Sequence, residues 1–299
     1  MVMPNFLILG AAKTGTTSIY RYMKQHPEIY MSPAKEPRFF VFENETLDFN
    51  GVGDEIETAK TSLQEYQQLF AGVEAEKAIG EATTMYLWSA KAPQRIKHYI
   101  PDVRMIAILR NPVDRAYSNY LHLKQAKREP LDSFSAAIQQ ESQRIKNHWW
   151  PFWYYKDQGF YYRQLQRYYS LFDSNQLKIY LYEDLKTEPL KLLQDIFSFL
   201  EVDDRFMPNI SEVVRKSHSV PKNQALQSLV SQPNPFKSFL KPLLPQNLRQ
   251  QIIKKINKKN LVKPQVSSKF RQQLIAEYRE DVLQLQELID RDLSPWLKV

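Results

Sequence analysis

FLILGAAKTGTTS, residues 6–18, lies almost at the start of this 299-residue chain and predicts the centre of its fold. An apolar run leads into a loop of small and hydroxyl residues, and residues 19–23 then continue at helical spacing. This order is typical of a buried parallel strand, a tight loop and a helix N-terminus. Similar runs alternate with helical stretches, so the sequence predicts an α/β fold with a parallel sheet formed by residues 5–9, 78–80, 104–109 and 177–182.

The loop and the helix start predict a binding site for a phosphate or sulfate group. Unpaired N–H groups and the positive end of the helix dipole favour an anion at this position. Lys13 adds a full positive charge, and further donors come from the hydroxyls of Thr14, Thr16, Thr17 and Ser18. The loop is not a Walker A motif, because that motif has its lysine directly after the last glycine, whereas Thr16 follows Gly15 here.

A second apolar run, residues 103–109, ends in Arg110. Asn111-Pro112 then stops the strand and starts a helix, and Ser118 lies two turns into that helix. A nucleotide triphosphatase more often ends such a strand in an aspartate that binds a metal ion. A guanidinium fork instead matches the geometry of phosphate, so Arg110 and Ser118 are candidate anion ligands. No cluster of Asp, His and Glu indicates a metal site, and none is expected.

Together the two segments resemble the sulfotransferases that use 3′-phosphoadenosine 5′-phosphosulfate (PAPS). The run from Lys13 to Thr17 resembles the loop that binds the 5′-phosphosulfate in this family, and residues 110–120 resemble its segment for the 3′-phosphate. The resemblance implies a P-loop-like three-layer fold, with a central parallel sheet flanked by helices, and PAPS as co-substrate without a metal. It implies that PAPS is bound by Lys13, Thr14, Gly15, Thr16, Thr17, Ser18, Arg110 and Ser118.

The closest subgroup is the carbohydrate type, which includes the heparan sulfate N- and 3-O-sulfotransferases. Residues 35–40, KEPRFF, resemble the segment that carries a catalytic glutamate there, so Glu36 is the expected base. Lys13 is the other expected catalytic residue, because its charge would stabilise the bridging oxygen and the departing phosphate. Glu81 is the second choice for the base and His122 the reserve.

Two departures from that subgroup concern its acceptor and cofactor contacts. Residues 81–84 read EATT where the 3-O-sulfotransferases have Glu-Lys-Thr-Pro, so the lysine is missing and their glycan specificity does not transfer directly. Their Lys-Gly-Arg loop is absent as well. Residues 217–224 are the nearest equivalent, and they resemble the Pro-(Arg/Lys)-(Ser/Asn) loop of other bacterial sulfotransferase-domain proteins. On the basis of that resemblance Lys222 is assigned to the 3′-phosphate.

The resemblance therefore predicts a sulfotransferase that moves the sulfuryl group from PAPS to a hydroxyl or amine of a carbohydrate, for instance in bacterial polysaccharide or glycolipid synthesis. A hydroxyl on a lipid or on a carrier-bound acyl chain is the alternative acceptor. A P-loop kinase is the alternative enzyme class, disfavoured by the displaced lysine and the missing metal-binding aspartate. A non-catalytic module that binds anions or membranes is the third reading.

Length and composition bear on the domain organisation and the location of the protein. A single domain over residues 1–299 is expected, with an irregular basic connector at about 231–265 and a C-terminal helix at 267–291. The chain has no cysteine, so it has no disulfide. No apolar run approaches the ~20 residues of a membrane span, and no signal peptide is visible, so a cytoplasmic protein is expected.

The net charge of +8 is unevenly distributed, since residues 241–263 contain many basic and no acidic side chains. A solvated helix face that packs by its isoleucines is the favoured interpretation, and peripheral contact with a membrane or an acidic glycan is the alternative. No motif supports a nucleic-acid partner.

A loop over the site is expected at residues 43–54. The aromatic run at 147–157 is expected to form core or a lid rather than an acceptor wall.

Overall fold

The computed structural model describes residues 2–51, 58–211, 220–221, 261–262 and 266–299. The chain divides into two compact units, Met1–Val214 with Ser268–Val299, and Arg215–Ser267. In the second unit the described residues form a two-stranded antiparallel sheet of β6 (Val220–Pro221) and β7 (Leu261–Val262). Lys222 and nearly all of the basic segment 241–263 lie outside the described residues, so those predictions stay predictions.

The first unit is built on one parallel sheet, which confirms the predicted fold class. Its strand order is β2-β3-β1-β4-β5, with β1 in the middle. Phe6 in β1 pairs with Gly80 in β3 on one side and with Arg104 in β4 on the other. Four strands match the predicted runs, and the fifth, β2, has three residues and was not predicted. The strands are β1 (Phe6–Gly10), β2 (Ile29–Met31), β3 (Ala78–Ala82), β4 (Arg104–Leu109) and β5 (Leu177–Leu181).

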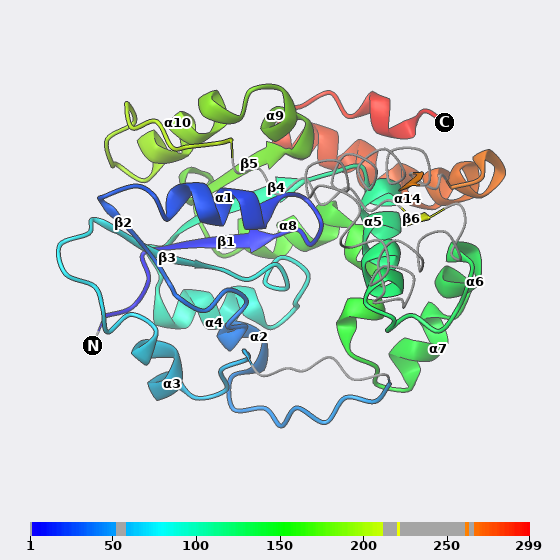
Figure 1. The fold of residues 1–299 in the computed structure, drawn as a ribbon, viewed down its shortest axis with the longest axis horizontal. Coiled ribbons are helices and arrows are strands. Elements are labelled where there is room, and N and C mark those ends of the chain that lie inside the picture. Colours follow the sequence, from blue (N-terminus) through cyan, green and yellow to red (C-terminus); the bar gives the residue numbers. More distant parts are fainter. Residues whose placement is uncertain (1, 52–57, 212–219, 222–260, 263–265) are drawn as a thin grey trace, which may run out of the picture. The chain divides into compact units, whose positions relative to one another are not determined.

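Both faces of the sheet are covered, because the residues of β1 are buried without alternation. On one face, Ile8 and Ile106 join a core cluster with α1 (Thr16–Met23) and α10 (Pro189–Phe199). Figure 1 shows α1 and α10 on one side of the sheet and α4 (Ala92–Tyr99) on the other. This three-layer arrangement brings the carboxyl ends of β1, β3 and β4 together at one edge.

The remaining helices cover the sheet and its ends. Helix α14 (Ser268–Ile289) lies within residues 267–291, the range expected for a C-terminal helix. No helix among the described residues is long and apolar enough to span a membrane. The others are α2 (Phe39–Phe42), α3 (Leu63–Gln68), α5 (Pro112–Gln125), α6 (Phe134–Gln139), α7 (Glu141–Lys146), α8 (Tyr161–Tyr169), α9 (Tyr182–Thr187), and the 3-10 turns η1 (Pro151–Trp153), η2 (Asp157–Gly159), η3 (Ser174–Gln176) and η4 (Ser294–Leu297).

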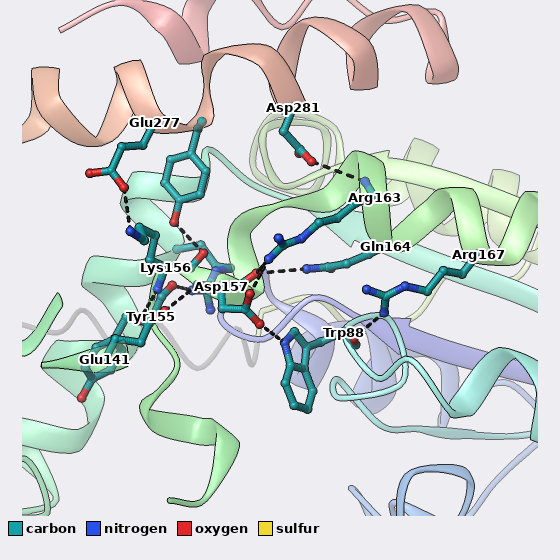
Figure 2. A network of polar contacts seen from close by, with 12 residues as sticks. Trp88, Glu141, Tyr155, Lys156, Asp157, Arg163, Gln164, Arg167, Glu277 and Asp281 are labelled. Atoms are coloured by element: carbon teal, nitrogen blue, oxygen red, sulfur yellow. Dashed lines mark hydrogen bonds and ion pairs between the residues drawn. The ribbon is translucent and has the colours of Figure 1, made fainter. Parts of the chain in front are cut away.

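A polar network centred on Asp157 fixes the aromatic segment to the surrounding helices (Figure 2). The Asp157 carboxylate accepts from Trp88 Nε1 at 2.5 Å and pairs with Arg163 of α8. Its backbone N–H donates to the buried Glu141 at 2.8 Å, and the neighbouring Lys156 pairs with Glu277 of α14 at 2.7 Å. Within the segment, Trp150, Trp153, Tyr154 and Tyr155 are all buried, as expected for core.

Candidate active site

The loop after β1 has a conformation that requires its glycines. Gly10 has φ +147°, and a Cβ there would lie 2.8 Å from the carbonyl oxygen of Thr84. Gly15 has φ +91°, and a Cβ there would lie 2.5 Å from Leu185 Cδ2. A side chain at either position would be strained and would collide with its neighbour. The glycines therefore let the loop pass close to β3 on one side and α9 on the other.

The start of α1 is arranged as the sequence predicts for an anion site. Gly15 precedes the helix in the left-handed conformation, and no side chain caps the helix N-terminus. The hydroxyl of Thr14 is buried and donates to the carbonyl of Ala11 at 2.7 Å, so in this structure it stabilises the loop. Lys13 has a positive φ of 70°, which places it at the bend of the loop. Uncapped N–H groups and a lysine in one loop suit a phosphate or sulfate.

Arg110 joins this loop to the end of β4. Its Nη1 donates to the carbonyl of Lys13 at 3.1 Å. Its guanidinium lies 4.7 Å from the ring centroid of Tyr182, the first residue of α9. Its own carbonyl accepts a hydrogen bond from the Tyr161 hydroxyl at 3.0 Å. The structure thus brings together the two segments that the sequence analysis paired.

The helix after Arg110 begins as predicted. Asn111 caps α5 by accepting from the backbone N–H groups of Val113 and Asp114, at 3.0 and 3.2 Å. Ser118 lies two turns into α5 and is buried. His122, one turn further along, is exposed and packs edge-on against Phe152. Ser118 therefore faces inward, whereas the reserve base lies at the surface.

Glu36 lies beyond the end of β2 and is tied to the end of β3. Its carboxylate accepts from the Thr84 backbone N–H at 2.9 Å and from the Thr84 hydroxyl at 3.1 Å. Lys35 Nζ lies 2.7 Å from the same carboxylate. Because the Thr84 carbonyl also lies against Gly10, a single residue separates Glu36 from the start of the anion-binding loop. The predicted base and the predicted loop are therefore neighbours.

The two glutamates at this edge have opposite pKa shifts. Burial would raise the pKa of Glu36, but the charges of Lys35 and Arg38 and the bond from Thr84 outweigh it and lower the pKa. Glu81 is fully buried and accepts from Thr83 Oγ1 at 2.9 Å and from the Tyr66 hydroxyl at 3.3 Å. Burial, with the added repulsion from Glu36, raises the pKa of Glu81 to about 8. At neutral pH Glu36 is therefore ionised and Glu81 protonated, a division typical of acid and base roles.

The raised pKa of Glu81 leads to a test of stability. Below pH 4.5 Glu81 is protonated in both the folded and the unfolded chain, and its full contribution is present. Between pH 4.5 and about 8 only the unfolded chain ionises, so stability falls as pH rises. Relative to Glu81→Gln, which stays neutral, the wild type should lose about 1.4 kcal/mol of unfolding free energy per pH unit within this window. Urea unfolding at pH 5, 6, 7 and 8 measures this difference, and parallel curves for the two proteins would contradict the assignment.

The donor set fits PAPS, an anion with a phosphosulfate and a separate 3′-phosphate. The uncapped helix start and Lys13 suit one anionic group, and the guanidinium fork of Arg110 suits the other. Among the described residues, no three Asp, Glu, His or Cys side chains are grouped so that they could hold a metal ion.

Two residues at this edge were not selected from the sequence. Thr84 holds Glu36 and faces Gly10, and Tyr182 lies beneath the guanidinium of Arg110. Tyr182 directly follows β5, so the rule that selected Arg110 after β4 could have found it. Thr84 carried no such signal, because its role depends on the non-local pairing of β3 with β1.

Comparison with known proteins gives a matching family model and a full-length structural relative. The family model of the sulfotransferase domain matches residues 3–228. A solved sulfotransferase from Alicyclobacillus acidocaldarius is 33% identical, with a TM-score of 0.79 over 100% of both chains.

Two curated proteins are similar in sequence to parts of this chain. A bifunctional heparan sulfate N-deacetylase/N-sulfotransferase 4 from Mus musculus is 28% identical over 71% of this chain, which spans 24% of that protein. A membrane-associated sulfotransferase, kil1, from Dictyostelium discoideum is 32% identical over 49% of this chain, which spans 30% of that protein. The chain thus covers less than a third of the length of these two relatives. With the matching family model and the full-length structural relative, the chain belongs to the sulfotransferase family.

Proposed function

We propose that this protein transfers the sulfuryl group of PAPS to a hydroxyl or amine of a carbohydrate acceptor. The observation that carries the proposal is the contact between Arg110 Nη1 and the Lys13 carbonyl, 3.1 Å long, which joins two anion-binding segments at the carboxyl ends of neighbouring strands. In open α/β sheets, ligands bind in this position, where the strand order changes direction. PAPS is the donor typical of the family.

Lys13 has the charge to bind the phosphosulfate, and the N–H groups from Gly15 to Thr17 lie at the uncapped start of α1, where an anion is favoured. Sulfuryl transfer resembles phosphoryl transfer in that positioning and charge neutralisation supply most of the catalysis. Lys13 would therefore stabilise the negative charge that grows on the bridging oxygen as the bond to sulfur breaks. Arg110 and Ser118 would hold the 3′-phosphate and so orient the reacting end.

Glu36 is the group that would accept the proton of the acceptor. Its lowered pKa keeps it ionised at neutral pH, and Thr84 fixes the carboxylate with two hydrogen bonds. The side chain keeps 18% of its surface exposed, so an acceptor can reach it, whereas Glu81 is fully enclosed. A positioned carboxylate that can reach the acceptor is the requirement for a general base.

The acceptor class is supported by the mouse relative, which is named a heparan sulfate N-deacetylase/N-sulfotransferase. The site differs from the 3-O-sulfotransferase pattern at position 82, where Ala82 replaces the lysine and is fully buried. Lys35 and Arg38, on either side of Glu36, place positive charge beside the proposed base and lower its pKa. We therefore place the acceptor on the side of the site formed by residues 35–38.

The donor is tested by thermal unfolding with adenosine 3′,5′-bisphosphate, the product that PAPS leaves behind. At 100 times its dissociation constant, a ligand of the native state adds about 2.7 kcal/mol of stability, which gives a clear rise in Tm. ATP with magnesium serves as the comparison. A rise with ATP and none with the bisphosphate would contradict the proposal and favour a kinase.

The acceptor is tested by sulfate transfer from labelled PAPS to panels of glycans, lipids and hydroxyacyl carriers. We expect label in the glycan panel. Label confined to lipids or carriers would keep the chemistry and overturn the acceptor class.

A further inference from the structure

The C-terminal tail after α14 contacts the proposed PAPS site at two points. Arg291 forms a two-pronged ion pair with Asp184 of α9, with Nη2–Oδ1 at 2.8 Å and Nη1–Oδ2 at 3.2 Å. Further along, the carbonyl of Trp296 in η4 accepts from Asn111 Nδ2 at 3.1 Å. Both contacts join segments more than 100 residues apart in the sequence. One ends at Asn111, next to Arg110, and the other ends on α9, whose first residue, Tyr182, contacts Arg110.

The first contact leads to the guanidinium of Arg110 through α9. Asp184 Oδ2 accepts from the backbone N–H of Leu181 at 2.9 Å and so closes the first turn of α9. That turn begins with Tyr182, whose ring lies 4.7 Å from the Arg110 guanidinium. Arg291 holds Asp184 from the other side, so the ion pair fixes the turn that carries the ring.

The second contact leads to the backbone of Arg110. Asn111 is the next residue in the chain, and its side chain both caps α5 and donates to the Trp296 carbonyl. Trp296 is buried, with its ring 6.3 Å from that of Tyr161. Tyr161 in turn donates to the Arg110 carbonyl at 3.0 Å. The tail therefore stabilises the backbone at Arg110, which sets the position of the Arg110 side chain.

We propose that Arg291 and Trp296 are positioning residues that hold Arg110 in the orientation needed to bind the 3′-phosphate of PAPS. This inference rests on the proposed function, in which Arg110 is a PAPS ligand. A bidentate phosphate contact depends on the direction of the guanidinium fork, so a small rotation of Arg110 weakens binding even though its charge is unchanged.

Binding of adenosine 3′,5′-bisphosphate, measured by calorimetry, tests the role of the ion pair. Arg291→Gln should raise the dissociation constant about two- to thirtyfold, the usual range for a coupled residue without ligand contact. The KM for PAPS should rise by the same factor with kcat nearly unchanged, and Arg291→Lys should recover part of the affinity. Glu277→Gln is the matched control, because it breaks an ion pair of similar exposure on α14 that ends at Lys156. It should leave the affinity unchanged.

Asp184→Asn distinguishes two explanations for an effect of Arg291 on binding: positioning of Arg110, and direct attraction between the charge of Arg291 and the anion. This change removes a negative charge near the site, so an effect of charge alone would strengthen binding. Positioning instead predicts weaker binding, as for Arg291→Gln. It also predicts that the double variant loses less affinity than the sum of the two single losses. Trp296→Ala should weaken binding as well, through Tyr161.

Four outcomes are decisive. An unchanged affinity in folded Arg291→Gln, or a gain in Asp184→Asn, overturns the inference while the proposed function stands. If Glu277→Gln loses as much affinity as Arg291→Gln, the inference is also overturned, because the effect would then be general destabilisation. A wild-type protein that does not bind the bisphosphate contradicts the proposed function itself, and the inference fails with it.

Discussion

Glu36→Gln should lower turnover by about 10²–10⁴, the usual contribution of general base catalysis, while binding of adenosine 3′,5′-bisphosphate changes little. Glutamine keeps the shape of the side chain and can still accept one bond from Thr84, but it cannot take the proton of the acceptor. Single-turnover kinetics with PAPS and an identified acceptor measure the loss, and calorimetry measures the binding.

Glu28→Gln provides the matched control for Glu36→Gln. Glu28 is also ion-paired to a lysine, Lys77, and has a lowered pKa, but it lies before β2 whereas Glu36 lies after it. Its replacement should leave turnover unchanged. Full turnover in Glu36→Gln would transfer the role of base to Glu81 or His122. Loss of bisphosphate binding in that variant would instead indicate that Glu36 only holds the loop.

The pH profile gives an independent check of the same residue. Lys35 and Arg38 keep the pKa of Glu36 below its ordinary value in the free protein. Since kcat/KM reports the free enzyme, its acidic limb should lie below pH 4.5. Bound PAPS adds negative charge nearby and should raise this pKa, so the acidic limb of kcat should lie at higher pH. In Glu36→Gln both acidic limbs should disappear.

The sequence was sufficient for the parts of this site that depend on local pattern. The loop at residues 10–15 and the cap at Asn111 each follow from neighbouring residues, and the structure has both. The adjacency of Lys13 and Arg110 also follows, because two strands that neighbour each other in a parallel sheet end at the same edge.

What the sequence could not predict depends on contacts between distant segments. The opposite pKa shifts of Glu36 and Glu81 come from how deeply each is buried and which cations lie nearby, and neither is visible in the order of residues. The contact of Trp296 with Asn111 links positions 185 apart. Strand β2 was missed because three residues are too short to show a period.

Arg110→Ala should weaken binding of adenosine 3′,5′-bisphosphate by about 2–5 kcal/mol, or roughly 30- to 5,000-fold, because removal of one partner of a buried charge pair leaves the other unpaired. The alanine also loses the bond to the Lys13 carbonyl and the contact with Tyr182, so the loop after β1 is no longer tied to β4. Calorimetric titration of the folded variant measures the loss.

Two further variants decide what Arg110 contributes. Arg110→Lys keeps the charge but loses the planar fork, so it should recover only part of the affinity, since a point charge cannot bind two phosphate oxygens in parallel. Arg104→Ala is the control on the same strand: Arg104 lies at the opposite end of β4 and pairs with Glu201, so its loss should leave affinity intact. If an Arg110→Ala protein binds the bisphosphate as tightly as the wild type, the assignment of the 3′-phosphate to this position is wrong. A fully active Arg110→Lys protein would mean that charge alone binds the 3′-phosphate, and it would overturn the inference that the tail positions the fork.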